Sequence, residues 1–447
     1  MPEVESQGIV FIDKVTEEEY NPYAHRAPKR PLNNTQAFVL LTKGALGIGL
    51  LPSALTFKEG WVTGVIYTCV MGVIVTHCLH ILFRAQRHLC KHLKIPYLTY
   101  SESVRRALEY GPLRSRKFSK YVPFFVDTSM LMGQFALCTT YALFVLQTFG
   151  FFEQYTGGLY IGLKRYVYCF LLMIPCIFIV FLGNWKIVAG FAAFANIILI
   201  FPIFIFLSYV NGAQSPSNDL VAVGDLYQFP KVFGPILFAL EAVAVVSTFE
   251  GDLKHPKKFI GSCGVLNIGM FLVTSVYILV GCLGYWRFGE ASVGSFLNDM
   301  PLNDTASKWC RALYTLSIYL SYGVQGFVMV HILWKKKHRG HDQTFKHIFR
   351  IAIVGISTII ITFVPFIVRT AILDAMFAVS LPVLGVILPA FMEFCVVWPT
   401  HGNNRNKILW KDVFLIVLGL ANCIAELYFC AEQLIEFFSV RRKPIFW

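Results

Sequence analysis

Long apolar runs recur along this chain of 447 residues, separated by polar and charged stretches. A membrane-spanning helix needs about 20 mainly apolar residues, and eleven runs come close to or exceed that length. The pattern therefore predicts an all-α integral membrane protein with eleven transmembrane helices. The runs lie near residues 37–57, 62–83, 122–148, 166–183, 187–210, 232–250, 263–286, 311–333, 350–367, 370–397 and 411–436.

The composition also favours a membrane protein. Hydrophobic residues make up 56% of the chain and charged residues only 15%, whereas a soluble domain carries about 25% charged residues. The polar start of the chain is typical of a disordered tail. We therefore predict a disordered cytoplasmic tail over 1–35, a transmembrane transporter domain over 36–436 that is inserted in the lipid bilayer, and a C-terminal tail over 437–447.

The net charge of +13 is distributed in a way that indicates topology rather than nucleic-acid binding. Lys and Arg gather in alternate loops, with ten of them in the loop at 84–120. Loops rich in Lys and Arg stay in the cytoplasm, so the N-terminus is predicted to be cytoplasmic. On the opposite side, Asn303-Asp304-Thr305 is an N-glycosylation acceptor and predicts a glycan at Asn303. A plasma-membrane or a lysosomal or endosomal location fits equally well.

The first apolar run contains residues that an isolated membrane helix disfavours: Lys43, Gly44, Gly47, Gly49 and Pro52. Each glycine costs about 1 kcal/mol against alanine in a helix interior, and the proline about 3 kcal/mol. Broken backbone survives at membrane depth only where protein buries it or where it lines a cavity. Such a run is a pointer to a transporter's binding site, and close helix packing at small residues is the alternative.

The sixth apolar run carries Glu241 about ten residues from its start. An ionisable group near mid-bilayer is costly and is a candidate functional residue. Because burial favours its neutral form, Glu241 is a candidate to take up and release a proton. The alternative is a neutral side chain that is hydrogen-bonded to a neighbouring helix.

The first and sixth runs are five helices apart, which is the spacing of a five-plus-five inverted repeat of the leucine-transporter type with discontinuous helices 1 and 6. Half-helix N-termini favour an anionic group, and freed carbonyls favour a cationic one. A zwitterionic amino acid uses both. No metal-ligand cluster, phosphate-binding loop or nucleophile motif is present, so we expect no enzyme activity, no metal and no cofactor.

Several segments resemble the proton-coupled amino acid transporters of the amino acid/auxin permease group, in particular an insect-like or other invertebrate-like member. The resemblance covers about residues 36 to 436 and keeps the motifs in order. It rests on Lys43–Leu51, Cys138–Phe144, Ala239–Glu241 with Phe249–Lys254, Gly284–Gly289 with Leu297–Asn298, and Tyr314–Trp334.

This resemblance implies symport of small neutral amino acids with protons, and it implies the residues of the substrate site. Glu241 is then the candidate for proton coupling. The ammonium group of Lys43 either serves as a fixed cation at the place where sodium-coupled relatives bind an ion, or extends to the cytoplasmic surface. The implied substrate-binding residues are Gly44, Ala45, Leu46, Gly47, Gly49, Tyr141, Phe238, Ala239, Glu241 and Tyr322.

The chain departs from the family pattern near both breaks. Leu40 replaces a histidine that many members place three residues before the lysine, Ile48 replaces a polar residue, and Ala242 replaces a glycine. We expect the bulkier residues to narrow the pocket, alter specificity or abolish transport. Two alternatives to proton symport therefore remain: an amino acid sensor with little flux that signals to cytoplasmic partners through the loop at 84–120, and a sodium-coupled carrier.

Overall fold

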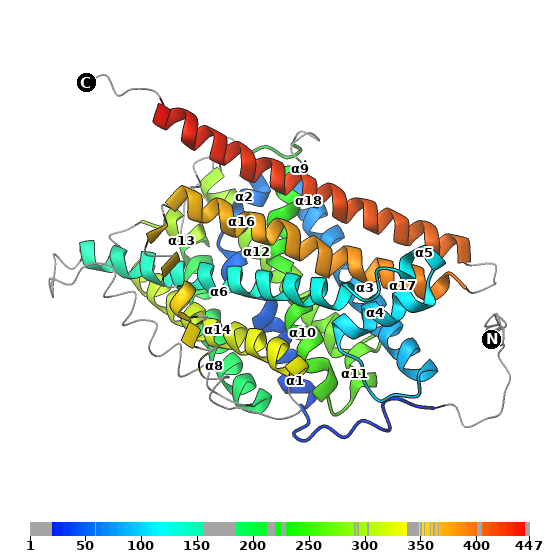
Figure 1. Cartoon of the computed structure of the whole chain (residues 1–447). Helices are drawn as coiled ribbons and strands as arrows, with labels where there is room; N and C mark the ends of the chain where they lie inside the picture. The colour runs from blue at the N-terminus through cyan, green and yellow to red at the C-terminus, as the bar shows by residue number, and fades with distance from the viewer. Residues whose placement is uncertain are drawn as a thin grey trace, which may run out of the picture.

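The regular elements of the computed structural model are helices throughout its described part (Figure 1). Within that part, the one β-type pairing is an isolated bridge between Leu32 and Leu253. The described residues are 20–58, 60–155, 184–211, 220–224, 229–240, 242–289, 292, 295–301, 304–337, 348, 351–352, 354–357, 359–360, 363–364, 366–399 and 405–442.

The described helices succeed one another along the chain. Their order is α1 (Asn34–Ala45), η1 (Ile48–Leu50), α2 (Ser53–Lys58), α3 (Trp61–His92), α4 (Tyr100–Tyr110), α5 (Leu113–Arg116), α6 (Val122–Tyr155), α8 (Trp185–Asn211), α9 (Phe229–Leu240), α10 (Val243–Phe249), η3 (Glu250–Asp252), α11 (Pro256–Ile260), α12 (Val265–Phe288), α13 (Phe296–Asp299), α14 (Thr305–Lys337), α16 (Phe366–Pro382), the π-helical turn η5 (Val383–Ile387), α17 (Leu388–Val397) and α18 (Arg405–Arg442).

Eight spans in the described part of the chain are long and apolar enough to cross a membrane, and each matches a predicted run. The first predicted run is present as three short pieces, α1, η1 and α2. The run at 166–183 and much of the run at 350–367 lie outside the described residues. The membrane-spanning, all-helical prediction is confirmed, and the count of eleven stays a prediction.

Both predicted breaks are present. After Ala45 the backbone turns extended at Leu46 (φ −85°, ψ 91°), and Gly47 (φ −139°, ψ −139°) leads into a single 3₁₀ turn before Pro52. In the sixth span α9 ends at Leu240 and α10 begins at Val243, after Ala242 with φ −135° and ψ 0°. Glu241 itself lies outside the described residues.

The broken spans lie inside the bundle and α18 lies at its margin (Figure 1). Of the most apolar part of the sixth span, Val232–Asp252, 82% is buried, against only 22% for α18. In the first span, residues 40–51 are buried throughout. The broken elements are therefore enclosed by protein, as unpaired backbone in a bilayer requires.

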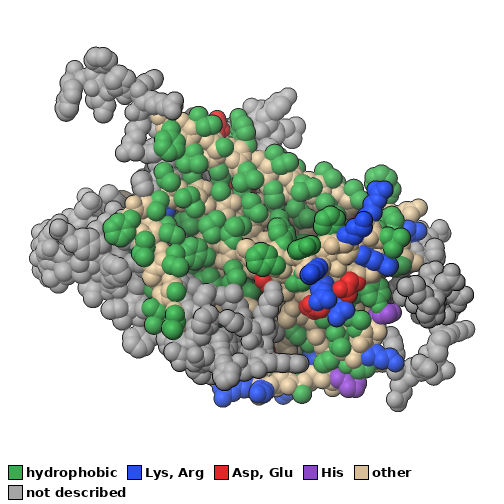
Figure 2. All heavy atoms as spheres, viewed as in Figure 1, with side chains coloured by type: hydrophobic (Ala, Val, Ile, Leu, Met, Phe, Trp, Pro, Cys, Tyr) green, Lys and Arg blue, Asp and Glu red, His purple; other side chains and the backbone are tan. Residues whose placement is uncertain are grey.

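One face of the molecule is largely hydrophobic, with Lys and Arg gathered toward one end (Figure 2). Exposed large apolar side chains include Phe124 on α6 and Ile424, Tyr428 and Ile435 on α18. A continuous apolar surface of this kind is what contact with lipid requires.

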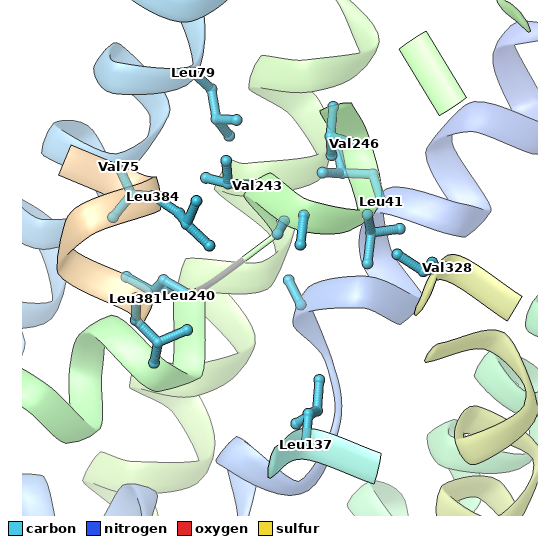
Figure 3. Packing of buried hydrophobic residues seen from close by; sticks show 14 of the residues in the cluster. Leu41, Val75, Leu79, Leu137, Leu240, Val243, Val246, Val328, Leu381 and Leu384 are labelled. Carbon is cyan, nitrogen blue, oxygen red and sulfur yellow. The ribbon is translucent and has the colours of Figure 1, made fainter. Parts of the chain in front are cut away.

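Apolar side chains pack on both sides of the breaks (Figure 3). Leu41, Val246 and Val328 lie close together where α1, α10 and α14 meet. On the other side, Leu240 of α9 lies near Leu381 at the end of α16. This packing holds the short half-helices, which are too short to be stable alone.

A matched pair of glycines tests this packing. The Phe57 ring on α2 is fully buried against Gly281 on α12, where an added Cβ would overlap the ring and lie 3.1 Å from the Ser53 carbonyl oxygen. We expect Gly281→Val to lower the free energy of unfolding by roughly 1–3 kcal/mol through overpacking. Thermal unfolding in detergent measures it. Gly190→Val on α8, where a Cβ meets open space, is the control, and equal losses in the two variants would contradict the packing argument.

Candidate functional site

Tyrosines from two distant helices hydrogen-bond the backbone that the first break frees. The Tyr277 hydroxyl of α12 donates to the Ala45 carbonyl oxygen at 3.0 Å, and the Tyr314 hydroxyl of α14 donates to the Gly47 carbonyl oxygen at 2.8 Å. Both tyrosines are buried. An unpaired carbonyl at this depth would cost several kcal/mol, so these bonds make the break stable. The sequence analysis did not single them out, although a buried tyrosine hydroxyl normally requires a partner.

The glycines of the break permit close approach by three different elements. A Cβ on Gly44 would lie 3.1 Å from the side chain of Val245 on α10, and one on Gly49 would lie 2.9 Å from the Cα of Ala239 on α9. A Cβ on Gly47 would overlap the hydroxyl of Tyr141 on α6. Close packing and a broken helix therefore occur together here, and the two interpretations of this segment are not exclusive.

The break lines a central cavity of about 20 Å³, which is room for about one water molecule. Ile48, one of the departures from the family pattern, is in its wall, as we expect for a residue that narrows the pocket. The predicted residues that line this cavity are Gly44, Ala45, Gly47, Gly49, Tyr141 and Phe238.

The other predicted substrate residues lie elsewhere. Ala239 lines a neighbouring cavity of about 10 Å³ with Gly49 and Tyr277. Leu46 is buried beside the break, and Tyr322 is buried in α14 with its hydroxyl 3.5 Å from Ser357 Oγ; neither lines the central cavity.

Two polar residues of the central cavity were missed by the sequence analysis. Gln134 on α6 and Ser380 on α16 are 2% and 0% exposed and line the cavity. Gln134 Oε1 and Ser380 Oγ have no hydrogen-bond partner in the described structure. The amide oxygen can accept from an ammonium group, and the hydroxyl can donate to a carboxylate. Their sequence signal was a polar side chain inside an apolar run.

Two larger cavities flank the central one. A cavity of about 570 Å³ lies beside it, and Phe238 of α9 and Phe377 of α16 line both. Their ring centroids are 4.8 Å apart, so this ring pair stands between the two spaces. A cavity of about 290 Å³, lined by Ser247 and Thr248 of α10, lies toward the other end of the sixth span. The small central space is thus enclosed between two wider ones.

Lys43 is fully buried, so the predicted extension to the cytoplasmic surface is wrong. Its Nζ donates to Ser317 Oγ at 2.9 Å, and Ser317 Oγ donates to the Ala195 carbonyl oxygen at 2.8 Å. The side chain points into the bundle because α8 and α14 supply these hydrogen-bond acceptors there. Lys43 therefore places an amino group next to the first break.

The segment before α1 docks on the bundle. The Leu32 amide donates to the Asp252 carbonyl oxygen at 2.8 Å, and the Lys254 amide donates to the Leu32 carbonyl oxygen at 2.9 Å. The prediction of a disordered tail over 1–35 is therefore wrong for residues 20–35. The reason is that this polar segment finds backbone and charged partners at the end of the sixth span.

An ion pair holds this docked segment. Arg26 Nη1 lies 2.8 Å from Glu250 Oε1, and the two side chains are only 7% and 3% exposed. The Arg26 guanidinium also stacks on the Tyr23 and Tyr97 rings, 4.8 and 5.2 Å from their centroids. Burial, with the nearby Glu250 carboxylate, raises the pKa of Tyr23 to about 12, so its phenol stays neutral at neutral pH. The pair joins the N-terminal segment to the end of α10.

Among the other predicted residues, the proton candidate Glu241 and the glycan acceptor Asn303 lie outside the described residues. Gln134, Ser380, Tyr277 and Tyr314 are thus the polar side chains that the described structure adds around the first break.

A family model for the transmembrane amino acid transporter protein family matches residues 30–431. The chain is 27% identical over 425 residues to the "proton-coupled amino acid transporter-like protein pathetic" of Drosophila melanogaster, covering 94% of this chain and 89% of that protein. It is 22% identical over 427 residues to the "probable amino acid transporter skat-1" of Caenorhabditis elegans, covering 91% of each.

Solved structures of membrane transporters have the same fold. MhsT in complex with L-phenylalanine matches with a TM-score of 0.54 at 13% identity, covering 90% of this chain and 97% of that one. The nucleobase-cation symporter Mhp1 matches with a TM-score of 0.51 at 11% identity, covering 96% and 97%. The fold is that of the leucine-transporter type. Relatives and fold are those of membrane transporters, so the prediction that the chain is no enzyme is confirmed.

The contact between Gly47 and Tyr141 can be tested with a double-mutant cycle. We expect Gly47→Ala to destabilise the protein by roughly 1–3 kcal/mol, since its Cβ overlaps the Tyr141 hydroxyl. Tyr141→Phe removes the overlapping oxygen and is expected to restore part of the loss. Thermal unfolding of the two single variants and the double variant measures the coupling. Additive effects would show that the two residues do not meet at the break.

The buried ion pair can be tested with a matched pair of arginines. Arg26→Ala leaves the Glu250 carboxylate without its partner, which for a buried pair costs about 3–5 kcal/mol. We expect this face to open, so that a cysteine introduced by Ser247→Cys in the 290 Å³ cavity reacts several-fold faster with a membrane-impermeant maleimide. The exposed Arg30 of the same segment gives the control, Arg30→Ala. Equal labelling rates in the two backgrounds would rule out a closing role for Arg26.

Proposed function

The chain belongs to the transmembrane amino acid transporter family, and we propose that it carries small neutral amino acids across a membrane in symport with protons by alternating access. The observation that carries this proposal is the enclosed central cavity at the first break, where Gln134 Oε1 and Ser380 Oγ lack partners. A zwitterionic substrate would supply a donor and an acceptor for them.

The size and lining of the cavity support a small, uncharged side chain in the substrate. The cavity holds about one water molecule, and no Lys, Arg, Asp or Glu lines it in the described part of the chain. Admission of an amino acid would therefore require the wall to move. The Phe238–Phe377 pair is the movable part on the side of the 570 Å³ cavity, because it rests on ring contact.

Proton coupling is supported by the similarity to a proton-coupled amino acid transporter-like protein of Drosophila and by the acidic residue in the sequence of the sixth span. In the sequence Glu241 comes between Leu240 and Ala242, which are both buried. In this proposal Glu241 carries the proton, and Lys43 occupies with its amino group the place where a sodium-coupled relative holds an ion. Such a fixed cation favours sodium independence.

The orientation follows from the distribution of charge. In this proposal the loops rich in Lys and Arg, together with the docked segment before α1, face the cytoplasm. Arg26 and Glu250 then close the cytoplasmic side, and the 570 Å³ cavity belongs to the external or luminal side. The plasma membrane and lysosomal or endosomal membranes are both compatible with this topology.

Uptake of labelled alanine, glycine and proline into proteoliposomes tests the function. We expect uptake that rises when the external pH is lowered from about 7.5 to about 5.5 and does not depend on sodium. Glu241→Gln is expected to abolish proton-driven accumulation while some exchange remains, because a neutral amide cannot carry a proton. The exposed Glu432 on α18 gives the matched control, Glu432→Gln.

Three other results of these uptake and binding experiments would contradict parts of the proposal. Uptake that requires sodium would replace the proton by a sodium ion. Binding of these amino acids without uptake would favour a sensor. An unchanged pH dependence in Glu241→Gln would remove Glu241 from the coupling mechanism.

A further inference from the structure

The cavity of about 570 Å³ between α9, α16 and α18 has polar lining residues that the central cavity lacks. Its volume lies within the roughly 300–1,000 Å³ that is typical of small-molecule sites. Aromatic and aliphatic side chains such as Phe238, Phe377 and Leu373 form one part of its wall. Polar side chains form the other part, and they come from α6, α16 and α18.

The polar side chains of α18 form one stripe along the helix. Asn422, Glu426, Cys430 and Gln433 recur at helical spacing and all line the cavity. Large apolar side chains between them, Ile424, Leu427 and Tyr428, are exposed. A peripheral membrane helix thus turns an amide and a carboxylate inward, and polar groups inside a membrane span indicate a ligand or transport path.

The buried side chain of Asn422 gives separate evidence for a ligand in this cavity. Its side chain is 4% exposed, and neither Oδ1 nor Nδ2 has a hydrogen-bond partner in the described structure. An unpaired buried amide costs about 1–3 kcal/mol. A bound ligand with both hydrogen-bonding and apolar parts would remove that cost.

The acidic side chains in the wall of the cavity favour a ligand with a cationic group. Asp374 of α16 and Glu426 both line it, and the described lining contains no Lys, Arg or His. The Glu426 carboxylate lies against the backbone of Gly234 in α9, where any side chain would overlap it. The two carboxylates therefore face one space from two helices, without a basic side chain in its wall to balance them.

We propose that this cavity is a second binding site, in which Asp374 and Glu426 hold the ammonium group of a small amino acid. The Asn422 Oδ1 accepts from the same ammonium group, and its Nδ2 donates to the carboxylate of the ligand. The apolar wall receives the rest of the ligand, and the Phe238–Phe377 pair separates this site from the central cavity. The large, partly apolar volume favours an amino acid over a bare ion. The choice of ligand rests on the proposed function, since the substrate then passes through this site before or after the central one.

Binding of labelled alanine to the purified full-length chain tests this site. In the wild type we expect two classes of bound alanine, one of which ethylamine displaces. Ethylamine keeps the ammonium group without the carboxylate. Propionate, which keeps the carboxylate without the ammonium group, is expected to leave that class in place.

Three variants define the residues. Glu426→Gln is expected to weaken the ethylamine-sensitive class about tenfold, in keeping with loss of one charged contact, and Glu432→Gln on the same helix is expected to leave it unchanged. Asn422→Leu is expected to weaken the same class while thermal stability stays equal or rises, because the change removes an unpaired buried amide. This variant separates loss of ligand from loss of fold.

Uptake into proteoliposomes, measured in parallel, separates this proposal from the proposed function. An ethylamine-sensitive class in a chain that transports nothing would support the second site and count against transport. Uptake by a chain in which ethylamine displaces no bound alanine would overturn the second site and leave transport intact. The same conclusion would follow if Glu426→Gln bound the ethylamine-sensitive alanine as tightly as the wild type does. Displacement by sodium or potassium but not by ethylamine would also overturn it, since the site would then bind an inorganic cation.

Discussion

Backbone groups in a membrane must be hydrogen-bonded within the protein, and this requirement organises the centre of the structure. The first span breaks between Ala45 and Ile48, and the carbonyl groups freed there are held by Tyr277 and Tyr314 from α12 and α14. Without these hydroxyls the break would have to close into a helix or admit water. The break in turn creates the cavity at which the unpaired groups of α6 and α16 face inward.

The sixth span connects the other features. Its first half touches Glu426 of α18 through Gly234 and contributes Phe238 to the ring pair. Its second half lines the 290 Å³ cavity and ends at Glu250, which pairs with Arg26. A movement of the two halves relative to each other would thus change both larger cavities and the space between them. This is the geometry that alternating access needs.

Local composition was sufficient to predict the fold in outline. Runs of apolar residues predict spans because each helix must match the bilayer thickness, and the eight long spans of the described part agree with them. Glycines and a proline predict the first break because they carry an intrinsic cost in a helix. Of the residues predicted to bind substrate, Gly44 and Phe238 line the central cavity, whereas Tyr322 does not. The reason is that a position in a predicted helix does not tell which side of the helix faces the cavity.

The sequence by itself determined the eight long spans of the described part of the chain and the interruptions of its first and sixth spans, since hydropathy and helix propensity are properties of short local stretches. The tertiary structure decided which groups meet at those interruptions. It buried Lys43 against Ser317 and paired Arg26 with Glu250. It also placed the side chains of Gln134, Ser380 and Asn422 in the walls of cavities. The partners in the two contacts are more than 200 residues apart, and local pattern carries no information about such distances along the chain.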